Sequence, residues 1–190
     1  PGAESLIESA LYMMWDLKLK VGHASRTIKD CLRLGREDYT IRTSLVEFRF
    51  LTGDADLAET LRKRLWTDLF RSTAAEFVEA KLAERAARHT KQGGQRYVVE
   101  PNVKEGKGGL RDLQSMYWIA KYVNGVRTTE ELVGRGVFTP EEFATFVNAE
   151  DFLWAIRCHL HMIANRAMDQ LTFDMQVQVA ERMGYTDHDG

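Results

Sequence analysis

Apolar residues recur at helical spacing over most of the chain. In residues 3–17 they fall three or four positions apart, which predicts an amphipathic opening helix. Residues 19–27 instead alternate with period two, which predicts a strand. Helical spacing returns afterwards, and further helices are predicted at 28–34, 38–53, 73–89, 110–123, 139–163 and 174–184. Another is predicted after Asp54, where leucines recur every four residues from Leu57 to Leu69. The pattern therefore predicts a mostly α protein with a small α/β piece at its N-terminal end.

Three of these helices begin with capping signals. Asp54 is placed to cap the helix that follows it. Thr73 and Glu76 form a capping-box pattern, in which each side chain would satisfy a free backbone amide at the helix start. Thr139 is followed by Pro140 at the first helical position and by Glu142, so the long helix at 139–163 has the most complete start signal.

The composition is that of an ordinary globular protein. The 190 residues are 44% hydrophobic and 28% charged, and the net charge of -2 argues against a dedicated nucleic-acid binder. Cys31 and Cys158 lack disulfide-framework or metal-ligand spacing, so a reducing cytoplasm is expected. No apolar run approaches the roughly 18 residues that span a bilayer, so no membrane association is expected. Because the chain starts at Pro1 without methionine and lacks a closing element, we expect a piece of a longer protein.

Charge is distributed unevenly although it nearly cancels. Residues 61–96 hold nine Lys or Arg against four Asp or Glu, whereas residues 128–151 hold one Arg against six acids. These stretches could be contact faces for phosphates or for a partner protein, or simply solvated helix faces. The four tryptophans (Trp15, Trp66, Trp118 and Trp154) fall on apolar helical faces and are predicted to belong to the core.

The loop at 100–112 contains the clearest candidate binding residues. Its glycines allow close backbone approach, and the helix that follows directs free N–H groups and its positive dipole end toward the loop. Lys104, Lys107 and Arg111 would add full positive charges to such an anion site. The spacing matches neither a Walker A loop nor a dinucleotide fingerprint, and a simple turn at a helix entry is the alternative.

Four stretches together resemble a known family: 11–27 (LYMMWDLKLKVGHASRT), 38–47 (DYTIRTSLVE), 99–113 (VEPNVKEGKGGLRDL) and 151–161 (DFLWAIRCHLH). In this order they are similar to the bifunctional uridylyltransferase/uridylyl-removing enzymes of the PII nitrogen-signalling protein. The resemblance implies a longer enzyme: a polymerase-β-type nucleotidyltransferase domain adds UMP from UTP to a PII tyrosine, an HD-type domain removes it, and ACT domains sense glutamine. Mg²⁺ would be the cofactor.

On this resemblance the chain divides into two parts. Residues 1–53 would be the C-terminal part of the nucleotidyltransferase palm, and residues 54–190 a helical domain leading toward the HD domain. The expected fold is thus a mainly α helical bundle that follows the last α/β part of the palm. The catalytic Asp-x-Asp motif is absent, and His188-Asp189 lacks the further ligands of an HD metal site. We therefore expect no metal site here and an inert fragment.

The resemblance also suggests residue roles. A similar loop in the related adenylyltransferase of glutamine synthetase implies nucleotide-side roles for the following loop residues: Lys104, Lys107, Gly108, Gly109, Arg111 and Asp112. Asp112 could instead cap or pair near the helix start. Gly22 stands where that relative has a third catalytic carboxylate, and Glu47 is a weak substitute, more simply paired with Arg42 or Arg49.

His23 and Arg26 complete the candidate nucleotide contacts, although a lone histidine is more often structural. The alternative function is a non-catalytic helical module that docks PII or neighbouring domains, with 61–96 and 128–151 as its contact faces.

Overall fold

The computed structural model describes residues 2–93 and 98–186, and within them the regular structure is helical. The helices are α1 (Gly2–Asp16), α2 (Ile28–Glu37), α3 (Tyr39–Val46), α4 (Ala55–Leu65), η1 (Trp66–Phe70), η2 (Arg71–Thr73), α5 (Ala74–Lys91), α6 (Leu110–Asn124), α7 (Glu130–Gly134), α8 (Pro140–Ala164) and α9 (Phe173–Arg182). The expectation of a mainly α fold is confirmed. His188 and Asp189 lie outside the described residues.

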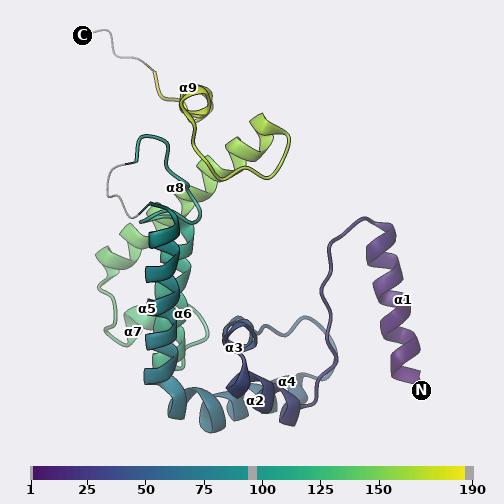
Figure 1. Cartoon of the computed structure of the whole chain (residues 1–190). Coiled ribbons are helices and arrows are strands. Elements are labelled where there is room, and N and C mark those ends of the chain that lie inside the picture. The colour runs from purple at the N-terminus through teal and green to yellow at the C-terminus, as the bar shows by residue number, and fades with distance from the viewer. Residues whose placement is uncertain (1, 94–97, 187–190) are drawn as a thin grey trace.

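The strand expected at 19–27 is wrong. That segment has no regular secondary structure, and the one β-pairing in the described chain is an isolated bridge between Asn102 and Gln170. A strand exists through its ladder to a neighbour, and alternation alone does not supply that neighbour. Figure 1 shows the segment linking α1, which stands apart, to α2. The assignment of residues 1–53 to a palm stays a prediction.

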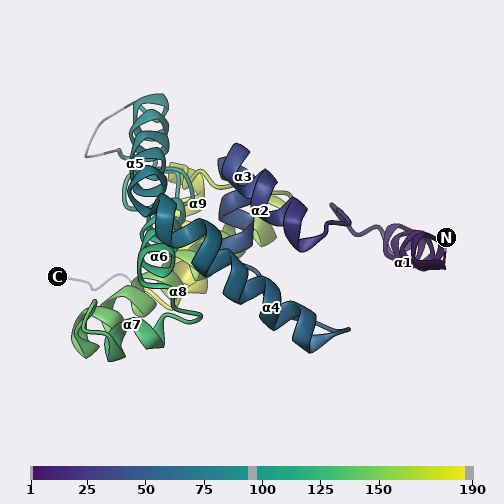
Figure 2. The ribbon, with the colours of Figure 1, turned by 90° about the horizontal axis from the view of Figure 1, so that it is seen from below.

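Helices α4 and α5 form one nearly continuous, bent rod. The turns between them are a π-helical stretch, η1, and a 3₁₀ turn, η2, and Figures 1 and 2 show the chain changing direction there. The capping box expected at Thr73 is therefore wrong, because a helix that continues has no free amides to cap. The Thr73 hydroxyl instead lies 2.7 Å from the Leu69 carbonyl and 2.6 Å from the Tyr122 hydroxyl.

The other start signals behave as predicted. Asp54 accepts from two amides of α4, and Thr139 and Glu142 form both bonds of a capping box at α8. The helix expected over 38–53 stops at Val46, and 47–54 is a non-helical connection. The tryptophan expectation holds in part, because Trp66 and Trp118 are half-buried whereas Trp15 and Trp154 are exposed.

The core consists of several small, separate clusters of buried side chains rather than one large one. One joins α2, α3, α4 and η1 through Cys31, Leu32, Leu45, Leu65 and Leu69. A second stacks Phe77 of α5 on Tyr122 of α6, with ring centroids 3.9 Å apart, and a third joins the 100–112 loop to α8 and α9 through Val103. The first cluster crosses the proposed boundary at 53/54, because α2 packs on α4 and Leu45 of α3 belongs to the same cluster.

Candidate functional site

Backbone and side-chain hydrogen bonds fold the loop at 100–112 tightly. The Asn102 side chain accepts from the amides of Lys104 (3.1 Å) and Glu105 (2.7 Å), and its carbonyl accepts from Gly106 N at 2.9 Å. Gly109 is tightly enclosed, since a Cβ there would lie 2.8 Å from the Val103 carbonyl oxygen. The sequence needs glycine here for close backbone approach, as the loop pattern predicted.

The amides at the start of α6 have partners inside the loop. Leu110 N donates to Val103 O at 3.0 Å, Arg111 N to Lys104 O at 2.9 Å, and Asp112 N to Gly109 O at 2.9 Å. The expectation of free N–H groups is therefore wrong at these three positions. The loop doubles back over the helix start, and its own carbonyls satisfy the amides.

Asp112 fastens α5 to the start of α6. Its carboxylate is 9% exposed and lies 2.5 Å from Arg88 Nη2, 2.9 Å from His89 Nε2 and 2.9 Å from Gly108 N. Burial opposes its ionisation, but the hydrogen bonds from Gly108, Arg88 and His89 outweigh burial and lower the pKa of Asp112 below its ordinary value. The pairing alternative for Asp112 thus has direct geometric support.

Asp169 is a second anchor, on the segment between α8 and α9. Arg157 donates to it at 2.7 Å, while His161 and Lys104 lie 3.2 and 3.9 Å away. Burial would raise the pKa of Asp169, but the bond from Arg157 leads the effects that lower it. Val103 N also donates to the Asp169 carbonyl at 2.8 Å, so the loop is tied to the C-terminal helices.

Glu105 connects the two anchors. It lies 3.6 Å from Arg111, 3.7 Å from Arg88 and 3.8 Å from Lys104, distances typical of loose ion pairs. We call Glu105, Asp112, Asp169 and the basic side chains around them the loop charge cluster. Its arginines and lysines (Arg85, Arg88, Lys104, Arg111 and Arg157) outnumber those three carboxylates, so the cluster carries a positive surplus.

The structure brings some predicted residues together and leaves others apart. Lys104, Arg111 and Asp112 belong to the loop charge cluster, Lys107 and Gly108 lie on the exposed rim of the loop, and Gly109 is buried. His23 and Arg26 lie on the segment between α1 and α2, which both ribbon views place away from the loop. His23 is exposed, its ring 6.4 Å from that of Trp15.

The expected partners of Glu47 are wrong. Glu47 lies 3.2 Å from Lys121 Nζ of α6. Arg42 is 1% exposed. Its guanidinium donates to the carbonyls of Gly35 (2.6 Å) and Arg36 (2.8 Å) and forms an ion pair with Glu76. No sequence spacing connects positions 47 and 121, because the pair forms only where α3 packs on α6.

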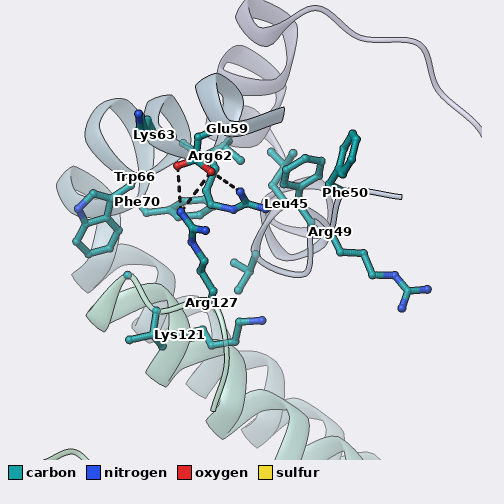
Figure 3. Close-up of a pocket in the computed structure, with 15 residues that line it drawn as sticks. Leu45, Arg49, Phe50, Glu59, Arg62, Lys63, Trp66, Phe70, Lys121 and Arg127 are labelled. Atoms are coloured by element: carbon teal, nitrogen blue, oxygen red, sulfur yellow. Dashed lines mark hydrogen bonds and ion pairs between the residues drawn. The ribbon is translucent and has the colours of Figure 1, made fainter. Parts of the chain in front are cut away.

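A pocket that the sequence pattern did not predict lies beside this ion pair. It lies between α4, the 47–54 connection and the C-terminal end of α6, and Figure 3 shows Arg62 and Arg127 converging on the Glu59 carboxylate. The basic stretch at 61–96 was the one available signal, and it supplies Arg62 and Lys63 to the lining.

The described carboxylates do not form a metal centre. Within residues 2–93 and 98–186, no three His, Cys, Asp or Glu side chains gather where they could hold a metal ion. The same part of the chain contains no helix long and apolar enough to cross a membrane.

The fold and these sites define a helical segment in which partly buried carboxylates lock a glycine-rich basic loop between helices. Residues 76–190 match the family model described as GlnD PII-uridylyltransferase, and the chain belongs to that family. It is 67% identical over 190 residues to the bifunctional uridylyltransferase/uridylyl-removing enzyme of Cereibacter sphaeroides, and 65% identical over 188 residues to that of Ruegeria pomeroyi.

The matches to these two relatives cover 100% and 99% of this chain but only 20% and 21% of theirs, so the chain spans about a fifth of their length. No solved structure matches the chain.

Proposed function

We propose that this chain is the helical centre of a longer cytoplasmic enzyme that transfers UMP from UTP to a tyrosine of the PII protein and hydrolyses it off again. The observation that carries the proposal is the identity of about two thirds, over essentially the whole chain, to enzymes named for both activities. Control of nitrogen assimilation, with glutamine acting through ACT domains elsewhere in the protein, follows from the same resemblance.

We assign this chain a supporting role in nucleotide use. The positive surplus of the loop charge cluster suits a phosphate. Lys104 is its loosely held cation, with carboxylate partners at 3.8 and 3.9 Å. Arg111 is also held by a 2.9 Å hydrogen bond to Gln114, but its carboxylate partner, Glu105, is 3.6 Å away. Side chains held this loosely can turn toward an anion at little cost, whereas Asp112 and Gly109 keep the loop in shape. Lys107 and Gly108 lie on the rim of the loop, where a nucleotide would approach. His23 and Arg26 lie on the segment between α1 and α2, away from the loop, and would contact the nucleotide only from that other face of the molecule.

The carboxylates described here do not suit Mg²⁺. Asp112 and Asp169 each accept hydrogen bonds from arginine and histidine, which leaves no cluster of free oxygen ligands for a hard cation. We therefore derive no step through the metal from this chain, and we place the Mg²⁺ ligands in the rest of the enzyme. The same reasoning makes the isolated segment inert.

The test is UMP transfer to purified PII by the full-length protein with UTP and Mg²⁺, beside removal of UMP from modified PII. We expect both activities in the full-length protein and neither in the isolated 190 residues. Lys104→Ala should weaken UTP use more than UMP removal, while Lys91→Ala, an exposed lysine at the end of α5, should change neither. Equal loss of both activities in Lys104→Ala would indicate a folding defect and contradict the nucleotide role. PII binding without transfer by the full-length protein would favour the docking function.

A further inference from the structure

The pocket beside the Glu47–Lys121 pair has the features of an anion site with an aromatic wall. Its volume is about 480 Å³, within the range of sites that hold drug-sized ligands. The connection at 47–54 forms one side, α4 and η1 the second, and the end of α6 the third. The pocket is therefore built from three segments that only the tertiary fold brings together.

Positive charge in this pocket exceeds the carboxylates available to it. Arg62 Nη1 lies 2.6 Å and Arg127 Nη2 3.0 Å from the Glu59 carboxylate, so two guanidinium groups share one negative charge. Figure 3 shows them approaching Glu59 from different sides, while Arg49 extends away at the rim. Lys63 also lines the pocket, with its ammonium directed away from Glu59 (Figure 3).

Lys121 is the buried cation of the set. Its side chain is 9% exposed, and its carboxylate partner, Glu47, is itself about half exposed. Its ammonium also lies 5.0 Å from the centre of the Tyr117 ring. A buried ammonium with one water-accessible partner gains most from a second anion, because a nearby anion offsets its desolvation.

Aromatic rings line the pocket, but their faces differ in accessibility. The Arg62 guanidinium lies over the Phe48 ring at 5.5 Å. Gly125 lies against the Trp66 ring, where a Cβ would come within 2.6 Å of a ring carbon. Phe50 is 42% exposed and lines the pocket. It therefore offers the ring surface on which a planar ligand could stack.

We propose that this pocket binds a nucleoside polyphosphate, with its phosphates held by Arg62, Arg127 and Lys121 and its base packed on Phe50. Charge-assisted bonds from guanidinium to phosphate oxygens would replace the shared contact with Glu59. Lys121 lies ten residues after Arg111 on α6, about 15 Å along the axis, so the pocket and the loop charge cluster offer separate phosphate contacts. The inference rests on the proposed function for its choice of UTP as first probe.

The experiment is photolabelling of the full-length protein with 5-azido-UTP, followed by mass spectrometry of the labelled peptides. We expect label on peptides that contain residues 45–66 or 121–127. The double variant Arg62→Gln, Arg127→Gln should raise the half-saturating probe concentration at these peptides by about tenfold or more, as expected for lost charge-assisted bonds. Arg64→Gln is the matched control, since Arg64 lies on the same helix, pairs with Asp68 and does not line the pocket.

Competitors separate a nucleotide from a bare anion. UTP and ATP should displace the label more effectively than tripolyphosphate does, and Phe50→Ala should weaken the two nucleotides while leaving tripolyphosphate unchanged. Label confined to other regions, or a double variant no weaker than Arg64→Gln, overturns the proposal. Equal competition by tripolyphosphate together with an unaffected Phe50→Ala variant also overturns it, because the pocket would then recognise phosphate alone. UMP transfer by the wild type is scored separately, and its absence refutes the proposed function without altering the labelling result.

Discussion

Asp112→Asn tests whether a buried carboxylate joins α5 to the loop. Four groups surround this side chain: Arg88 at 2.5 Å, His89 at 2.9 Å, Arg85 at 3.3 Å and the Gly108 amide at 2.9 Å. The substitution keeps shape and volume but removes the negative charge. Arg88, which is 10% exposed, would then keep only the carboxylate of Glu105, 3.7 Å away.

The expected loss of unfolding free energy is about 2–3 kcal/mol. Removing one partner of a buried ion pair costs about 3–5 kcal/mol, because the other charge stays desolvated. Two contacts reduce that figure here: the asparagine oxygen still accepts from the Gly108 amide, and Glu105 still faces Arg88. Arg85 is half-exposed and loses little, since water replaces its partner.

Urea unfolding of the 190-residue chain, followed by circular dichroism at 222 nm, measures this loss. The midpoint should fall by about 1 M with an unchanged slope, which reports stability rather than compactness. Asp56→Asn, an exposed position in the first turn of α4, is the control and should change stability by less than about 0.5 kcal/mol. An Asp112→Asn variant as stable as this control would refute the anchoring role.

The stability difference between wild type and Asp112→Asn should also depend on pH in a defined direction. The folded-state pKa of Asp112 is lowered, so its contribution is fully present above the ordinary value of 3.8 and is lost as pH falls through the folded value. The gap between wild type and Asp112→Asn should therefore hold at pH 5–7 and narrow below about pH 4. A gap that widened on acidification would contradict the assignment.

Three further substitutions, one of them with a matched glycine control, separate local from tertiary effects, each measured by thermal or urea unfolding. Gly109→Ala should cost about 1–3 kcal/mol because its Cβ meets backbone carbonyls that cannot move aside, whereas Gly134→Ala, with open space around it, should be neutral or stabilising. Thr139→Ala should cost about 1 kcal/mol through loss of the α8 cap, and a neutral result would contradict the capping box. Arg42→Lys should cost about 2 kcal/mol, since an ammonium cannot reach the Gly35 and Arg36 carbonyls and Glu76 together, and full stability would show that charge alone suffices.

Local signals predicted the helices well and their exceptions poorly. The caps at Asp54 and Thr139 form because their partners lie within three residues, which a linear pattern contains. Thr73 carries the same local signal, but the helix runs through it and its hydroxyl meets Tyr122, 49 residues away. The alternation at 19–27 failed for the matching reason, because a strand depends on a neighbour that the pattern does not specify.

The sequence by itself determined the helical class, most helix starts, the glycine-dependent loop at 100–112 and, through its resemblance, the family. These properties depend on residues close together in the chain or on long runs of residues in order. Tertiary structure alone decided which charges meet: Asp112 with Arg88, Glu47 with Lys121, and Arg62 with Arg127 across Glu59. Such pairs form where helices distant in sequence pack within a few ångströms, and many long basic and acidic side chains could have served equally well until packing selected among them.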